Sequence, residues 1–307
     1  MVAISKYLVT GAAGFIGSNL CKHLLSQGHD VTGMDNLSLG VKSNLPEHER
    51  FSFFPFSCQW VDTTRDFDGV FHLAACSSAP MFAEHPSVCM HQNISGFNAV
   101  AEHCSKHKIP LVYASTSSMM ENGVVPVPKT FYELSKFVNE ESAKVYSNER
   151  GLRSIGLRFF SVYGPNELHK GPYANLATQF LKSVLRKEPV TIYGDGSQTR
   201  DFVFVDDVVA ALALSMEQLS AGPDGGGVSR FYSVGTGYSY SLTELVKAIE
   251  GVTQKRCKVN HVINPIKNYV FNTLADSRQF VPGWDARVGL LDGLEKVKKH
   301  LEDERVV

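Results

Sequence analysis

The chain has 307 residues, of which 43% are hydrophobic, and a formal net charge of −1 at pH 7. This length and hydrophobic fraction predict one or two folded domains and exclude a disordered chain. The near-neutral charge provides no basic stripe for a nucleic acid, and no apolar run reaches the ~18 residues of a membrane span. The six cysteines are scattered and no complete metal-ligand set is present, so we expect a cytoplasmic protein with reduced thiols and no metal.

Apolar strands alternate with helical stretches through the first half of the chain. Expected strands cover 7–10, 30–34, 51–54, 70–73, 111–114 and 153–160, and expected helices cover 86–107 and 131–149. Strands that alternate with helices in this way form parallel sheets with helices on both faces. The pattern therefore predicts an α/β fold with a doubly wound parallel sheet of the Rossmann type.

A glycine-rich turn joins the first expected strand to the helix after it. Residues 7–17 read Y-L-V-T-G-A-A-G-F-I-G, which places glycines at Gly11, Gly14 and Gly17. Only glycine lets the backbone turn tightly here and approach a pyrophosphate closely. The phosphates would bind N–H groups at the positive end of the helix, so Phe15 and Ile16 are also expected in the site. This context predicts a dinucleotide-binding turn.

Asp35 stands at the end of the second strand and is followed by Asn36. A carboxylate at this point can accept hydrogen bonds from both hydroxyls of an adenosine ribose and repel a 2′-phosphate. The alternative is a structural cap of the loop that begins at Asn36. We predict that both residues lie at the ribose and that the cofactor is NAD.

Tyr132 and Lys136 are one helical turn apart and therefore share a helix face. A free phenol titrates near pH ~10, and a nearby ammonium, together with a positive nicotinamide ring, would lower that value. In many helices such a pair is only a packed tyrosine and a solvated lysine. The strand end at 114–118, which reads A-S-T-S-S, favours catalysis because one of its hydroxyls can bond a substrate oxygen.

After Val162 the pattern changes to glycine- and proline-rich loops with shorter elements. We expect a helix at 176–187, a strand at 190–193 and a helix that a capping box at Ser241 and Glu244 opens. The sequence thus predicts a Rossmann domain at 1–162 and a smaller lobe at 163–307, with a strand returned to the first domain.

Together these motifs resemble the extended short-chain dehydrogenase/reductase family, in particular its nucleotide-sugar epimerases and dehydratases. The resemblance covers nearly the whole chain, and its most specific motifs are L-R-F-F-S-V-Y-G-P at 157–165 and Y-G-D-G-S-Q-T-R-D-F at 193–202. It implies NAD as cofactor, a UDP-sugar bound by the second lobe, and a homodimer formed through the helices near 86–107 and 131–149.

The resemblance also implies individual roles. Hydride would leave sugar carbon 4 while Tyr132 takes the hydroxyl proton, Lys136 tunes it and holds the nicotinamide ribose, and Thr116 orients the oxygen. Further contacts to NAD are implied for Leu73, Ala74 and Ala75, and contacts to the substrate for Ser117, Ser161, Asn175, Leu176, Tyr193, Arg200 and Lys267. The chain departs from the family where Ser161 replaces an asparagine, Lys267 an arginine and Ser57 an adenine-binding aspartate.

The reaction outcome depends on the loop after the serine strand. Ser117 and Ser118 stand where 4,6-dehydratases carry an acidic pair, which is similar to the epimerases. Glu121, however, follows Met119 and Met120 where most relatives have glycine, and it could move the carbon-5 proton or assist a group leaving carbon 6. Glu121 favours elimination of water across carbons 5 and 6, as in dehydratases of antibiotic biosynthesis. A UDP-hexose 4-epimerase and, more remotely, a non-catalytic NAD-binding regulator are the alternatives.

Overall fold

The computed structural model describes residues 4–61, 66–121, 125–222, 226–264 and 270–304. The chain divides into two compact units: unit 1 is Met1–Arg158 with Val209–Tyr232, and unit 2 is Phe159–Val208 with Ser233–Val307. Within the described ranges, no helix is both long and apolar enough to cross a membrane.

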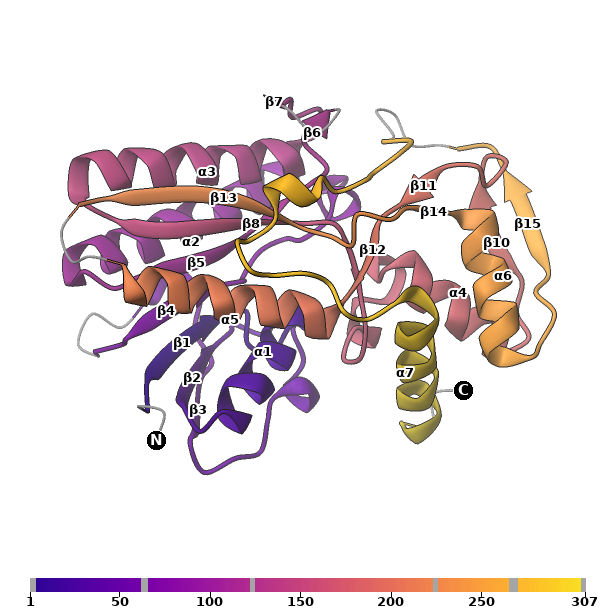
Figure 1. The fold of residues 1–307 in the computed structure, drawn as a ribbon, viewed down its shortest axis with the longest axis horizontal. Helices are drawn as coiled ribbons and strands as arrows, with labels where there is room; N and C mark the ends of the chain where they lie inside the picture. Colours follow the sequence, from indigo (N-terminus) through magenta and orange to yellow (C-terminus); the bar gives the residue numbers. More distant parts are fainter. Residues whose placement is uncertain (1–3, 62–65, 122–124, 223–225, 265–269, 305–307) are drawn as a thin grey trace. The chain divides into compact units, whose positions relative to one another are not determined.

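Unit 1 is built around a seven-stranded sheet (Figure 1). Its spatial order is β13 (Val228–Val234), β8 (Arg153–Phe159), β5 (Leu111–Thr116), β4 (Gly69–His72), β1 (Lys6–Thr10), β2 (Asp30–Met34) and β3 (Phe51–Phe54). Strands β3, β2, β1, β4 and β5 pair in parallel. The strand order reverses at β1, and such a reversal is where open α/β sheets bind ligands beyond the carboxyl ends of their strands.

Helices cover both faces of this sheet. Figure 1 shows α2 (Pro86–His107) and α3 (Phe131–Arg150) on one face, and α1 (Phe15–Ser26) and α5 (Val205–Ala221) on the other. The strands between them are buried on both faces, as the fully buried Val70, Phe71, Leu111 and Val112 show. The expected doubly wound fold is confirmed.

Most element boundaries agree with the sequence-based expectation to within two residues. Strand β5 extends to Thr116, two residues beyond the expected end, and β4 ends at His72 rather than at residue 73. Helix α4 (Leu176–Leu185) ends two residues early, because Lys187 adopts a left-handed conformation with a φ of 61°. The loop after β5 contains a short antiparallel pair, β6 (Met120–Glu121) with β7 (Val125–Pro126).

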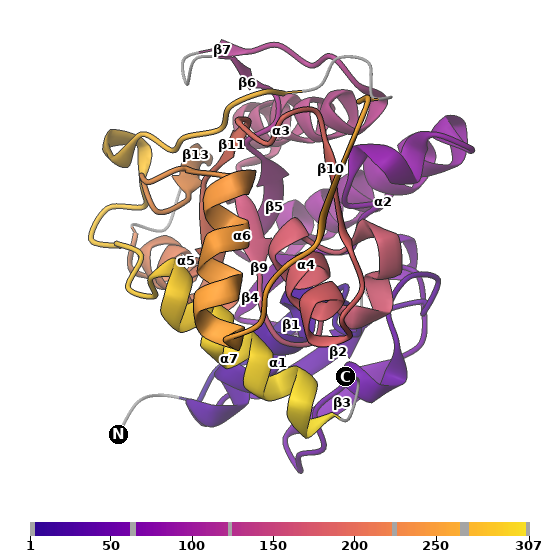
Figure 2. The ribbon, with the colours of Figure 1, turned by 90° about the vertical axis from the view of Figure 1, so that its right-hand side faces the viewer.

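In the described part of unit 2, three two-stranded sheets accompany three α-helices. The sheets pair β9 (Ser161–Tyr163) with β12 (Phe202–Phe204), β10 (Val190–Tyr193) with β15 (Val259–Val262), and β11 (Thr199–Arg200) with β14 (Tyr240–Ser241). Helices α4, α6 (Leu242–Thr253) and α7 (Leu290–Asp303) pack side by side (Figure 2). The expected capping box at Ser241 and Glu244 is confirmed at the start of α6. Short 3₁₀ helices are η1 (Lys42–Asn44), η2 (Cys58–Trp60), η3 (Ala79–Phe82), η4 (Leu168–Tyr173) and η5 (Ser277–Gln279).

Candidate active site

The glycine turn between β1 and α1 leaves no room for side chains. Gly11 has a φ of 74°, and a Cβ there would lie 2.7 Å from the backbone nitrogen of Ala74. A Cβ at Gly17 would overlap the carbonyl oxygen of Gly11. Helix α1 follows with Gly14 as its N-cap, without a side-chain cap and without an acidic residue in its first turn, which includes Phe15 and Ile16. The turn therefore offers helix N–H groups to an anion at close backbone approach, which fits the pyrophosphate of a dinucleotide.

The segment after β4 is held against this turn by Thr10. The Thr10 hydroxyl oxygen accepts hydrogen bonds from the backbone of Leu73 (3.2 Å) and Ala74 (3.3 Å) and shares a third with Nδ1 of His72 (2.9 Å). Burial lowers the pKa of His72 to about 3, so its ring is neutral and serves as a hydrogen-bonding group. Thr10 thus aligns the strand end that carries Leu73, Ala74 and Ala75 with the glycine turn.

Asp35 connects the end of β2 to the same turn. Its Oδ2 accepts a hydrogen bond from the backbone of Ala13 (3.1 Å), and its Oδ1 accepts one from Leu37 (2.8 Å). The exposed Asn36 uses its own Oδ1 to accept bonds from Ser38. The carboxylate therefore caps the loop that begins at Asn36, which is the structural alternative considered from the sequence.

Removing the charge of Asp35 tests its role in cofactor choice. We expect Asp35→Asn to weaken NAD binding by about 10- to 150-fold, the effect of losing hydrogen bonds to a charged group, and to narrow the preference for NAD over NADP. Asparagine keeps one acceptor oxygen for the turn, whereas Asp35→Ala keeps none. Calorimetry with both dinucleotides measures the effect. Equal affinity of the unmodified protein for NAD and NADP would contradict the assignment.

Tyr132 lies in the first turn of α3, whose start is fixed by a capping box between Thr130 and Glu133. The phenol is buried and packs at a ring-centroid distance of 5.9 Å from Phe82. Burial raises the pKa of Tyr132 to about 12, although the Thr116 side chain acts to lower it. The structure thus brings Thr116, at the end of β5, to the phenol. The lowering of this pKa expected with the nicotinamide ring beside the phenol stays a prediction, and burial acts against it.

Lys136 lies one turn further along α3 and is also buried. Its ammonium donates a 3.0 Å hydrogen bond to the carbonyl oxygen of Ala114 in β5. Burial lowers the pKa of Lys136 to about 8. The neighbouring Cys76, when ionised, acts in the opposite direction and raises the pKa of Lys136. The lysine is therefore a buried cation next to the strand end that carries Thr116.

Two buried polar groups behind these residues had no recognisable signal in the sequence. The first, Asn93 of α2, binds the backbone of Cys76 through its Oδ1 (2.8 Å) and Nδ2 (3.1 Å) and donates to the Ser135 hydroxyl (3.0 Å). Ser135 in turn donates to the carbonyl oxygen of Tyr132 (2.7 Å). Asn93 therefore couples the segment after β4 to the first turn of α3.

The second buried group is Glu140 of α3. Arg158 of β8 binds its carboxylate with two hydrogen bonds, of 2.9 and 2.7 Å, and the Ser115 hydroxyl of β5 donates a third of 2.7 Å. Both oxygens of Glu140 are thus engaged. This pair fixes helix α3 against the two strands beside it.

The loop after Thr116 begins with hydroxyl groups. The Thr116 and Ser118 hydroxyls share a hydrogen bond of 2.7 Å, and the carbonyl oxygen of the buried Ser117 accepts one from the backbone of Met120 (2.9 Å). Met119 is fully buried. The backbone of Glu121 pairs with Val125 in the β6–β7 turn, while its side chain lies outside the described part of the structure.

Unit 2 contains the remaining candidate substrate residues. Asn175 caps α4 by accepting a hydrogen bond from Ala177 (2.9 Å), so Leu176 is the first helical residue. The buried Glu167 supports this cap, since its Oε1 accepts a bond from the backbone of Asn175 (2.9 Å) and its Oε2 one from Thr178 (2.8 Å).

The other candidates in unit 2 stand at strand ends. Ser161 begins β9, the exposed Tyr193 ends β10, and Arg200 ends β11. The Arg200 guanidinium donates to the carbonyl oxygens of Thr199 (2.7 Å) and Phe271 (2.9 Å). Lys267 lies outside the described residues.

The acids proposed as alternative partners of Arg200 are engaged elsewhere. Asp201 accepts hydrogen bonds from the backbone of Thr236, Gly237 and Ala275. Asp206 forms an ion pair with Lys296 at 3.0 Å. The ligand-binding role expected for Arg200 stays a prediction.

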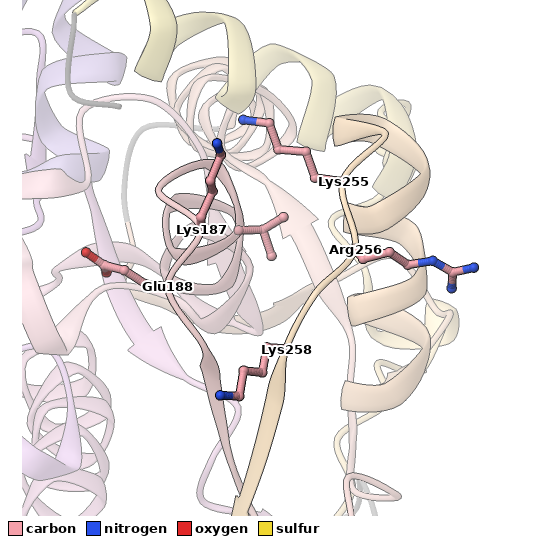
Figure 3. A pocket seen from close by; sticks show the side chains of 6 residues that line it. Lys187, Glu188, Lys255, Arg256 and Lys258 are labelled. Atoms are coloured by element: carbon pink, nitrogen blue, oxygen red, sulfur yellow. The ribbon is translucent and has the colours of Figure 1, made fainter.

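Unit 2 also has a depression lined mostly by basic residues, but their side chains do not converge on one point (Figure 3). A depression at the ends of α4 and α6 is lined by Val184, Lys187, Glu188, Lys255, Arg256 and Lys258. Their labelled side chains point in different directions (Figure 3). Lys255 donates to the carbonyl oxygen of Leu185 at 3.2 Å, as cations at helix C-termini do.

Comparison with known proteins gives a consistent result. The model of the NAD-dependent epimerase/dehydratase family matches residues 7–235. The chain is 33% identical over 312 residues to a UDP-glucose 4-epimerase of Mycolicibacterium smegmatis, covering 95% of this chain and 96% of that one. It is similar to the Thermotoga maritima UDP-glucose 4-epimerase solved with UDP-glucose, with a TM-score of 0.87, 29% identity and coverage of 98% and 99%. The Thermus thermophilus UDP-glucose 4-epimerase in complex with NAD gives a TM-score of 0.84, 29% identity and coverage of 97% and 99%.

Proposed function

Because this chain belongs to the NAD-dependent epimerase/dehydratase family, we propose that it oxidises a UDP-sugar at carbon 4 and then reduces it again. The observation that carries the proposal is the buried phenol of Tyr132 with the Thr116 side chain beside it and the buried ammonium of Lys136 one turn away. A hydroxyl, a proton acceptor and a cation are what oxidation of an alcohol requires. A regulator that only binds NAD needs none of the three.

The chain's own groups handle the proton. NAD, when bound on the glycine turn, supplies the hydride acceptor and a positive charge. The Thr116 hydroxyl orients the carbon-4 oxygen, and the Tyr132 phenolate removes its proton. Since burial raises the pKa of Tyr132 to about 12, the phenolate needs a cation close by, and Lys136 is the buried cation on the same helix face. The same phenol returns the proton when the ketone is reduced.

The site supports 4-epimerisation better than elimination. Glu133 and Glu140 are the buried carboxylates of unit 1 within the described residues, and both are engaged. Glu133 accepts bonds from the backbone of Lys129 and Thr130, and Glu140 is held by Arg158 and Ser115. The residues directly after Thr116 carry hydroxyls. Epimerisation needs no further acid, since the keto-sugar only has to present its other face. We propose a UDP-hexose 4-epimerase.

A UDP-sugar 5,6-dehydratase is the second candidate, and Glu121 favours it. This residue stands five positions after Thr116 in the β6–β7 turn, directly beyond Met119 and Met120. A carboxylate near carbon 5 of a 4-ketone can remove the acidified proton or protonate a group leaving carbon 6. The overall sequence pattern also resembles the UDP-N-acetylglucosamine 5,6-dehydratase of tunicamycin biosynthesis.

Products formed in heavy water distinguish the two reactions. The protein is incubated with a panel of UDP-hexoses and UDP-N-acetylhexosamines, and the products are analysed by mass spectrometry and NMR. We expect an isomer of unchanged mass without deuterium at carbon 5. Loss of water, with NMR showing a double bond between carbons 5 and 6 and no hydrogen at carbon 5, would overturn the epimerase in favour of the dehydratase. Absence of any sugar-dependent NADH signal or product would contradict both.

Glu121→Gln provides an independent check, because the amide matches the carboxylate in size. For an epimerase, we expect the rate of product formation to stay within about threefold of the unmodified protein. For a dehydratase, loss of acid–base assistance would lower elimination by about 100- to 10,000-fold while carbon-4 oxidation continues. Single-turnover measurement of NADH and of product separates the two steps.

A further inference from the structure

Ser118 makes two contacts to the hydroxyl oxygen of Thr116. This oxygen accepts a hydrogen bond from the backbone nitrogen of Ser118 (3.2 Å) and shares a second with the Ser118 hydroxyl (2.7 Å). Thr116 is the last residue of β5, and Ser118 lies in the turn directly after it. Thr116 is buried, whereas Ser118 is partly exposed. The loop therefore holds the buried hydroxyl through a single neighbouring residue.

The direction of the bond between the two hydroxyls decides where the Thr116 proton points. A hydroxyl has one proton to donate and two lone pairs that accept. The backbone N–H of Ser118 can only donate, so it occupies one lone pair of the Thr116 oxygen. If the Ser118 hydroxyl also donates, both lone pairs are occupied and the Thr116 proton is left for a third partner. If Thr116 donates to Ser118 instead, that proton is used within the loop.

The third partner of Thr116 is the phenol of Tyr132. The Thr116 side chain lies beside this phenol and acts to lower its pKa. A neutral hydroxyl lowers the pKa of a phenol by donating a hydrogen bond to the phenolate. The phenolate therefore requires the arrangement in which Ser118 donates to Thr116 and Thr116 donates onward. Donors arranged in such a chain also polarise one another, which strengthens the bond to the phenolate.

We propose that Ser118 is a positioning residue that donates its hydroxyl proton to Thr116 and thereby directs the Thr116 proton to the Tyr132 oxygen and to the carbon-4 oxygen of the sugar. The inference rests on the proposed oxidation at carbon 4, and it holds for an epimerase and a dehydratase alike. Without the Ser118 hydroxyl, the Thr116 proton can occupy other staggered positions. We expect the acidity of Tyr132 to fall by about 3- to 10-fold, the effect of one net hydrogen bond.

The charged and titratable groups around Tyr132 are the same with and without this hydroxyl. Glu133 and Lys136 lie on the same helix, and the thiols of Cys76 and Cys89 belong to the same buried cluster. Burial lowers the pKa of Lys136 to about 8 and raises that of Cys76 to about 12. Their titration changes the Tyr132 curve of each variant in the same way. A difference between variants therefore reports the lost hydroxyl.

Titration of Tyr132 tests the proposal without sugar turnover. The NAD-bound protein carries carbon-13 at the Cζ atoms of its tyrosines, and Tyr132→Phe identifies the Tyr132 signal by NMR. We expect Ser118→Ala to raise the pKa of Tyr132 by about 0.5 to 1 unit, whereas Ser118→Thr keeps the hydroxyl and should stay within about 0.2 units. Ser105→Ala is the matched control, because the Ser105 hydroxyl donates to Ala101 of its own helix, α2 (2.6 Å). Circular dichroism verifies that each variant is folded.

The pH profile of sugar oxidation provides a second readout. Because less phenolate is present below the raised pKa, NADH formation by Ser118→Ala should fall by about 3- to 10-fold there and return to within about twofold above it. The KM for the UDP-sugar should stay within about twofold. Ser118→Thr should restore the profile of the unmodified protein.

An unaltered pKa of Tyr132 in folded Ser118→Ala would overturn the proposal. A loss of activity that is equal at all pH values, or a raised KM alone, would also overturn it, since either would mark a direct contact between Ser118 and the sugar. If the unmodified protein formed no NADH with any UDP-sugar while Ser118→Ala still raised the pKa of Tyr132, only the proposed function would be wrong.

Discussion

Tyr132→Phe is expected to lower sugar-dependent NADH formation by about 100- to 10,000-fold, the usual contribution of a positioned acid or base. The variant keeps the ring that packs against Phe82 and the capping box that opens α3. It removes only the phenol oxygen, which lies beside the Thr116 side chain. Folding and NAD binding should therefore survive. Stopped-flow absorbance of NADH after mixing with a UDP-sugar measures the effect.

A second tyrosine on the same helix serves as the matched control. The Tyr146 hydroxyl donates to the carbonyl oxygen of Asn98 (3.4 Å), and Tyr146→Phe removes this single bond near the far end of α3. We expect it to retain nearly full activity. If Tyr132→Phe also retained most of its activity, another group would have to remove the carbon-4 proton and the proposed site would be wrong.

Lys136→Met is expected to produce an inactive protein that is more stable at neutral pH. The pKa of Lys136 falls from 10.5 to about 8 because burial disfavours the charged form. Below pH 8 the lysine is charged in both the folded and unfolded states, and its burial destabilises the fold by roughly 3 kcal/mol. Loss of the bond to Ala114 and imperfect packing offset part of this gain, so we expect a net stabilisation of about 1–2 kcal/mol at pH 7.

The pH dependence of the free energy of unfolding distinguishes the effect of the buried charge from an effect of packing. Between about pH 8 and 10.5 the unfolded lysine holds a proton that the folded one has lost, so the unmodified protein gains stability from Lys136 as pH rises. The advantage of Lys136→Met should shrink over the same range. Urea unfolding without added NAD at several pH values measures it, and the buried cysteines, whose thiols titrate in this range only after unfolding, contribute to both proteins. Lys144→Met, at an exposed ion pair on the same helix, should show no such trend. A constant difference at all pH values would contradict the buried-charge explanation.

The fold could be predicted from the sequence because its signals are local. Gly11 and Gly17 stand where a backbone contact excludes any side chain, and strands such as β2 and β3 are short apolar runs between loops. Tyr132 and Lys136 share a helix face by spacing alone. Each of these features is encoded within a few residues, so a single sequence is sufficient to read it.

The other features of the site depend on contacts between residues that are far apart in the sequence. Asn93 binds Ser135 across 42 positions, and Arg158 binds Glu140 from a different element. No local spacing encodes either contact. The direction of the Tyr132 pKa could not be predicted for the same reason, since the number of atoms packed around a phenol is a property of the folded chain. Glu121 remains a sequence-based hypothesis.

The buried pair of Glu140 and Arg158 also limits how this protein can evolve. The Glu140 side chain is 1% exposed and that of Arg158 is 13% exposed, so loss of either partner leaves a buried charge uncompensated. Such a loss costs about 3–5 kcal/mol, a large part of the roughly 5–15 kcal/mol by which proteins are stable. Replacing both partners with apolar residues can be neutral, but Ser115 would then lose its acceptor as well. Substitutions at these three positions are therefore tolerated only in combination. The sequence of helix α3 must change together with that of the strand that ends at Thr116.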